Sequence, residues 1–136
     1  MNRVVINTNK TKEMLLGPLS KSSPDELFID QAKVERVTGF TLLGIHVTSD
    51  LKWNTHIDKI CAKASSRLYF LKQLKRVELA ADQLRHFYLS AFRPILEYCS
   101  VVWYHGWHGL TRTQVKQLET VQRRAIQRHY NVSGHF

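Results

Sequence analysis

Residues 54–74, NTHIDKICAKASSRLYFLKQL, decide the fold of this chain. Their apolar side chains recur every three or four residues, which is the spacing of one face of an α-helix. The period therefore predicts an amphipathic helix that packs its apolar side against other elements. That apolar side consists of Ile57, Cys61, Ala64, Leu68 and Leu71, with Ile60 and Leu74 beside it.

Two further helical stretches follow in the sequence. A second apolar stripe occupies residues 84–102, and Pro94 inside it is expected to bend or split that helix near Arg93, because proline has no backbone N–H. A third helix is expected to begin after Thr111, since Thr111 and Gln114 have the spacing of a capping box. The sequence thus predicts three helices in its second part.

The first part of the chain is rich in short β-branched runs, which are typical of strands. Residues 4–6 predict one strand, residues 27–37 predict a hairpin with a four-residue turn, and residues 40–47 predict one further strand. We therefore predict an α+β fold with two domains. A small N-terminal β-hairpin or sheet occupies residues 1–50, and a three-helix, mainly α bundle occupies residues 51–136.

Charge is divided unevenly between these two domains. The chain has a formal net charge of +9. Residues 1–50 contain six bases and six acids, whereas residues 51–136 contain fourteen bases and five acids. A surplus of this size favours a polyanionic partner, either nucleic acid or an acidic membrane surface, although solubility alone is the simpler explanation. Its confinement to one domain favours a binding surface, and we expect nucleic acid as the partner.

Neither a membrane span nor a secretory signal is predicted. The longest uncharged stretch, residues 98–111, contains His and Gly and is too short to cross a bilayer. The two cysteines, Cys61 and Cys99, have no partner nearby in the sequence, which suits a reducing compartment. We therefore expect a soluble intracellular protein, nuclear or cytoplasmic, with no membrane partner.

The candidate binding residues are the bases of the first and third predicted helices. No acid interrupts residues 59–77, and bases spaced four apart lie on one side of a helix, where they can neutralise successive phosphates. A solvated helix face, or cations that favour the C-terminal end of the helix dipole, are the structural alternatives. The candidates are Lys59, Lys63, Arg67, Lys72, Lys75, Arg76, Arg123, Arg124 and Arg128.

No metal site is predicted. Cys99, His105 and His108 are possible zinc ligands, but no fourth ligand has a suitable spacing. His56 and Asp58 have the His-x-Asp spacing of an iron(II) facial triad. They lie where an amphipathic helix begins, however, and that motif needs a barrel rim and a distant histidine. We therefore interpret this spacing as chance.

Four segments, in order, resemble the reverse transcriptases of non-LTR (LINE-type) retrotransposons. INTNKTKEM resembles motif D, VERVTGFTLLGI resembles the primer grip (motif E), and DLKW followed by HI and KA resembles the start of the thumb. ILEY, VW and LETVQRRA resemble signatures further downstream. The four segments begin at residues 6, 34, 50 and 95. The resemblance implies a C-terminal fragment with the end of the palm, the primer-grip hairpin and a helical thumb.

The resemblance also implies what such a fragment does. Lys10 and Lys12 are motif-D-like, and Phe40, Leu43 and Gly44 are primer-grip-like. The family's catalytic Asp pair would lie before residue 6, so we expect no polymerase activity and no cofactor, with Mg²⁺ only in an intact parent enzyme. The expected partners are an RNA–DNA hybrid or duplex, gripped without regard to sequence, and the missing palm and fingers.

Two other interpretations remain open. The first is a helical protein-interaction module, and the second is a remnant without activity. Residues 7–14, NTNKTKEM, also resemble a short N-terminal module named for an alkylation-repair dioxygenase family. The residues do not support dioxygenase chemistry.

Overall fold

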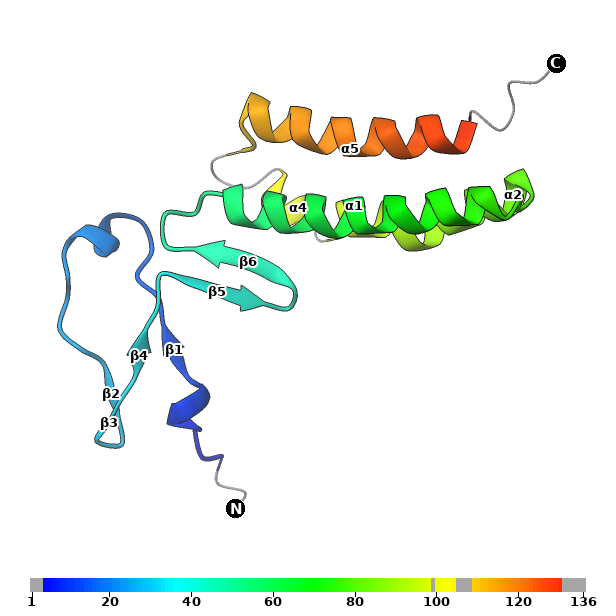
Figure 1. Cartoon of the computed structure of the whole chain (residues 1–136). Coiled ribbons are helices and arrows are strands. Elements are labelled where there is room, and N and C mark those ends of the chain that lie inside the picture. Colours follow the sequence, from blue (N-terminus) through cyan, green and yellow to red (C-terminus); the bar gives the residue numbers. More distant parts are fainter. Residues whose placement is uncertain (1–3, 99, 105–108, 131–136) are drawn as a thin grey trace. The chain divides into compact units, whose positions relative to one another are not determined.

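The computed structural model describes residues 4–98, 100–104 and 109–130. Contacts between residues divide the chain into two units, Met1–Trp53 and Asn54–Phe136. The described part of the first unit contains short strands and that of the second contains helices (Figure 1). The predicted α+β fold is therefore confirmed.

Three strand pairs lie in residues 4–53, the described part of the first unit. β1 (Lys12–Glu13) pairs in parallel with β4 (Glu35–Arg36). The two antiparallel pairs are β2 (Phe28–Ile29) with β3 (Ala32–Lys33), and β5 (Gly39–Leu42) with β6 (Ile45–Thr48). Two short 3-10 helices, Thr8–Lys10 and Gly17–Lys21, precede β1 and β2 respectively.

Both antiparallel pairs turn over two residues. Asp30 and Gln31 have φ angles of 49° and 66°, and Leu43 and Gly44 have φ angles of 49° and 83°. Positive φ at both central residues is the signature of the turn that fits the twist of a tight hairpin. The predicted four-residue turn is therefore two residues long. The single strand predicted over residues 40–47 is wrong, because the chain reverses at Leu43 and Gly44.

The strand predicted over residues 4–6 is also wrong. Val4 is 90% exposed and Val5 is 78% exposed, and neither belongs to a described strand. A β-branched run forms a strand only where a neighbouring strand or packed surface receives it. The segment that follows supplies the strand instead, since Lys12 and Glu13 pair with Glu35 and Arg36.

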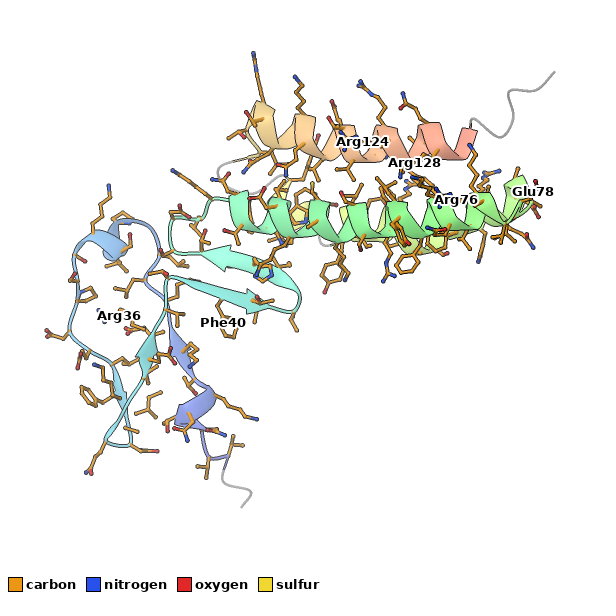
Figure 2. The ribbon with its side chains drawn as sticks, viewed as in Figure 1. Arg36, Phe40, Arg76, Glu78, Arg124 and Arg128 are labelled. Atoms are coloured by element: carbon orange, nitrogen blue, oxygen red, sulfur yellow. The ribbon has the colours of Figure 1, made fainter. Side chains whose placement is uncertain are left out.

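Opposite charges hold the parallel pair of β1 and β4 together. Lys12 forms an ion pair with Glu35, and the Nε atom of Arg36 donates to Glu13 at 2.9 Å. Arg36 also donates to the carbonyl oxygens of Pro24 and Asp25, each at 2.9 Å. Its guanidinium therefore ties the loop before β2 to this pair (Figure 2).

The described residues of the second unit form three helical segments. The first is α1 (Asn54–Arg76). The second comprises α2 (Ala81–Phe87), a π-helical turn (Tyr88–Phe92), α3 (Arg93–Glu97) and α4 (Ser100–Trp103). The third is α5 (Arg112–Tyr130). No helix of the described residues is long and apolar enough to cross a membrane.

Pro94 splits the second segment where the sequence predicted. Proline cannot donate the backbone hydrogen bond of a regular helical turn. Beside it, the N–H of Arg93 donates to the carbonyl of Tyr88, five residues back, which is the π-helical pattern. The predicted break near Arg93 is confirmed.

The capping box at the start of α5 is also confirmed. The backbone N–H of Gln114 donates to Thr111 Oγ1 at 3.2 Å, and the N–H of Thr111 donates to Gln114 Oε1 at 2.9 Å. The amide of Gln114 donates further to Asn54 Oδ1, at the first residue of α1. The start of α5 is thereby joined to the start of α1.

Helices α1 and α5 run parallel, side by side (Figure 1). Hydrogen bonds between their described side chains and backbone join the two helices, at positions that advance together along both. The bonded pairs are Asn54 with Gln114, Asp58 with Gln117 at 3.1 Å, and Leu68 with Arg128 at 3.4 Å.

The core of this unit is built on the predicted apolar stripe of α1. All five stripe residues are buried, and three of them, Ile57, Ala64 and Leu71, are fully buried. The segment from α2 to α4 contributes Leu84, Phe92, Leu96 and Trp103, and α5 contributes Val121 and Ala125. Burial of this apolar surface is the main term that stabilises the three segments together.

Candidate nucleic-acid interface

Helix α1 carries six bases and one acid, Asp58, which comes before all of them. Lys59 and Lys63 are exposed, and Arg67 is half-buried. Bases at intervals of four residues share one side of the helix. We call Lys59, Lys63 and Arg67 the flank stripe.

The flank stripe lies on the side of α1 that is turned from α5. His56, which is seven residues before Lys63 and therefore on the same side, has its ring 5.6 Å from the ring of Trp103 in α4. The contacts of α1 with α5 are made by a different side, through Asn54, Asp58 and Leu68. The stripe therefore runs along the flank of α1 beside the segment from α2 to α4.

Arg67 is the most constrained member of the stripe. Its Cζ atom lies 5.8 Å from the centre of the Phe70 ring, within the range of a cation–π contact. Its Nε atom is buried and has no hydrogen-bond partner within the described part of the chain. Lys59 and Lys63 are thus the two exposed cations of the stripe, and Arg67 is anchored beside an aromatic ring.

A second group of bases lies along the seam between α1 and α5. Arg128 donates to the carbonyl of Leu68, and Figure 2 shows it between the two helices. Arg124 is one turn before Arg128, and Lys72 is one turn after Leu68, so both belong to the same seam. Figure 2 shows Arg76 near the C-terminal end of α1. We call Lys72, Arg76, Arg124 and Arg128 the seam cluster.

The two remaining predicted bases lie elsewhere. Lys75 is half-buried in the last turn of α1. Arg123 lies on the outer face of α5 with Arg112 and Lys116, where they line a hollow of about 430 Å³ together with Glu119. The nine predicted bases therefore do not form one surface, since the flank stripe, the seam cluster and the outer face of α5 are separate.

Part of this charge has a structural reason. Because α1 and α5 are parallel, the negative ends of their two helix dipoles lie at the same end of the unit. Lys75 and Arg76 occupy the last turn of α1, and Arg128 lies near the end of α5. Cations at these positions stabilise the helix ends whether or not nucleic acid binds.

The sequence analysis missed an aromatic pair beside the flank stripe. Tyr69 and Phe70 are 59% and 48% exposed, and their rings meet edge to face with centres 5.9 Å apart. The signal was present, because Phe70 is seven residues after Lys63 and lies on the same side of α1.

The described residues contain no group of three side chains suited to hold a metal ion. His56 is buried against Trp103, whereas Asp58 accepts a hydrogen bond from Gln117, so the two side chains meet different helices. Cys99, His105 and His108 lie outside the described residues. Cys61 is buried, and the pKa of its thiol is raised by that burial and then by the charge of Asp58.

The residues assigned from the resemblance lie in the first unit. Lys10 ends a 3-10 helix and is exposed, while Lys12 is paired with Glu35. Phe40 lies on β5 and is 43% exposed (Figure 2). Leu43 and Gly44 form the hairpin turn, where Leu43 is 81% exposed.

One family match was found for the chain. Residues 53–91 match the family described as alkylated DNA repair protein alkB homolog 8, N-terminal. The match covers α1 and α2 and enters the π-helical turn, and it spans less than a third of the chain. It agrees with the alternative left open from the sequence, a module named for an alkylation-repair family, although it does not include residues 7–14. No curated protein and no solved structure matches the chain.

This finding corrects the reverse-transcriptase prediction, because the matching family is not a polymerase family. The physical reason is visible in the structure. Apart from DLKW, which precedes α1, the strings HI, KA and LETVQRRA lie in the amphipathic helices α1 and α5. Their spacing of apolar and basic residues is common to many unrelated helices. The match therefore gives no support to a missing palm and fingers as partners, or to Mg²⁺ in a parent enzyme. It also gives no support to the roles that the resemblance assigned to Lys10, Lys12, Phe40, Leu43 and Gly44.

Proposed function

We propose that the helical unit binds the phosphate backbone of nucleic acid without reading its sequence, as a binding element rather than an enzyme. One observation carries the proposal. The flank stripe presents three bases on one side of α1, and no acid follows Asp58 before Glu78. The name of the matching family refers to alkylated DNA, so DNA is the first polyanion to test.

The physical argument rests on spacing and exposure. Residues four apart on a helix are separated by about 6 Å along its axis, since each residue rises about 1.5 Å. Lys59 and Lys63 are exposed at that interval, and Arg67 continues the row. Cations in such a row release counterions from successive phosphates, which gives affinity without base recognition.

The experiment that tests this proposal uses the full chain and three DNA duplexes of equal length and unrelated sequence. We expect equal affinity for all three and a steep loss of affinity as salt rises, because the contacts are to phosphates. Absence of salt-dependent binding to any duplex overturns the proposal. A strong preference for one duplex contradicts the claim that sequence is not read.

A second candidate function is protein binding, and one groove favours it. The groove has a volume of about 360 Å³ and lies between α5 and the segment α3–α4. Its apolar lining consists of Leu96, Trp103, Val115 and Leu118, with Arg93, Glu97 and Glu119 at its polar positions. Substitution of Leu118 by Glu would block a partner there. It would leave DNA binding by the flank stripe unchanged.

A further inference from the structure

We infer that the flank of α1 takes an unpaired nucleic-acid strand, whose bases stack on Phe70 and Tyr69 while its phosphates meet Lys59 and Lys63. The inference rests on the proposed function and names its ligand more closely. It follows from the juxtaposition of the exposed Phe70 ring with a row of basic residues on one helix face, and from the exposed Tyr69 ring that contacts Phe70.

The two rings are exposed although they lie next to a buried stripe. Leu68 and Leu71 on either side of them are 5% and 1% exposed, whereas about half of Tyr69 and Phe70 is in contact with solvent. A large aromatic surface in water loses the free energy that burial would supply. A ligand that covers the rings recovers it.

Phe70 and the basic residues share one row on the helix, and the Tyr69 ring contacts Phe70 from the neighbouring side. Lys59, Lys63, Ser66 and Phe70 follow each other at intervals of four, three and four residues, which keeps them on one side. Phe70 is about 10 Å from Lys63 along the axis, at about 1.5 Å per residue. That length corresponds to roughly three stacked nucleotides at about 3.4 Å each.

Arg67 links the two kinds of contact. Its guanidinium lies 5.8 Å from the ring centre of Phe70 and one turn from Lys63. The Arg67 guanidinium thus holds positive charge beside the Phe70 ring. The phosphate of a nucleotide stacked on that ring would lie near this charge. Proteins that bind single-stranded nucleic acid commonly combine a row of basic residues with aromatic rings and arginine in this way.

The aromatic rings favour an unpaired strand over a duplex. In a duplex the base faces are covered by neighbouring base pairs, and only phosphates, sugars and groove edges are accessible. Stacking requires a free base face, as in a single strand, a gap or a frayed end. The neighbouring Lys and Arg side chains, with no acidic residue after Asp58 on α1, favour a polyanion over an apolar protein segment on this surface.

The test compares a single-stranded DNA oligonucleotide with a blunt duplex of the same length, by fluorescence polarisation with the full chain. We expect tighter binding of the single strand at equal salt. Phe70→Leu keeps an apolar side chain and removes the aromatic face. It should weaken single-strand binding roughly 5- to 150-fold, which corresponds to about 1–3 kcal/mol for one stacked base. Duplex binding should change less than about twofold.

The matched control is Phe28→Leu, because Phe28 is 56% exposed on β2 and lies in the first unit. It should leave both affinities unchanged. Circular dichroism checks that Phe70→Leu keeps the helices, and the comparison of wild-type affinities needs no variant. Equal wild-type affinity for both ligands, or an unchanged single-strand affinity in Phe70→Leu, overturns this inference and leaves backbone binding intact. Absence of binding to either ligand overturns the proposed function as well.

Discussion

The two sides of α1 contrast in what they contact. The side toward α5 is fully engaged, since Asn54, Asp58 and Leu68 each have a hydrogen-bond partner on α5. The flank with Lys59 and Lys63 is exposed and carries charge of one sign. Bases of the same type therefore differ in role. Arg128 at the seam stabilises helix packing, whereas the flank stripe remains accessible to a ligand.

The largest expected effect on stability comes from a substitution on the buried side of α1. Leu68 is 5% exposed and lies on the buried side of α1. Leu68→Ala therefore removes buried methyl groups and leaves a cavity. We expect a loss of roughly 2–5 kcal/mol in the free energy of unfolding, measured by urea denaturation. Lys63→Ala on the flank is the control, with an expected change within about 0.5 kcal/mol. Similar losses for the two variants would contradict the contrast.

A smaller effect separates the two kinds of arginine. Arg128→Gln removes the donor to the carbonyl of Leu68 and should cost about 1 kcal/mol of unfolding free energy. Arg123→Gln, on the outer face of α5, should change stability by less than about 0.5 kcal/mol. Both losses are measured by thermal and urea denaturation. If Arg123→Gln proves as destabilising as Arg128→Gln, the structural role of the seam arginine is wrong.

The smallest expected effect concerns Cys61, also on the buried face of α1. Burial raises the pKa of its thiol above the ordinary value of 9.0, so the folded chain holds this proton more firmly than the unfolded chain. The resulting stability is fully present below pH 9.0 and is lost as pH rises through the folded-state pKa. We expect Cys61→Ala to show a weaker decline of stability above pH 9.0 than the wild type. A decline equal to that of the wild type would count against this assignment.

Local and periodic features were predictable from the sequence. The buried stripe of α1, the break at Pro94 and the capping box of Thr111 and Gln114 each depend on residues within a few positions of one another. The parallel pairing of β1 with β4 was not predictable, because Lys12 and Glu35 are distant in sequence and the pair depends on the fold of the loop between them. Leucine at positive φ carries no sequence signal, which concealed the turn at Leu43.

The candidate site was predictable only in part. The spacing of Lys59, Lys63 and Arg67 placed them correctly on one side of α1. The sequence did not separate them from the seam cluster, because the packing of α5 on α1 is a tertiary property. The family prediction failed for a related reason, since short amphipathic strings resemble each other across unrelated proteins.

The most direct test of the account is a salt titration of the triple variant Lys59→Gln, Lys63→Gln, Arg67→Gln beside the wild type, by fluorescence polarisation on a DNA duplex. Removal of three phosphate contacts should reduce the magnitude of the slope of log K against log salt by about two to three units. The unfolding free energy should change little, because glutamine has nearly the helix propensity of lysine and arginine. Lys21→Gln, in the 3-10 helix Gly17–Lys21, is the control and should leave the slope unaltered. An unchanged slope and affinity in the triple variant would remove the flank stripe from the binding surface and contradict the account.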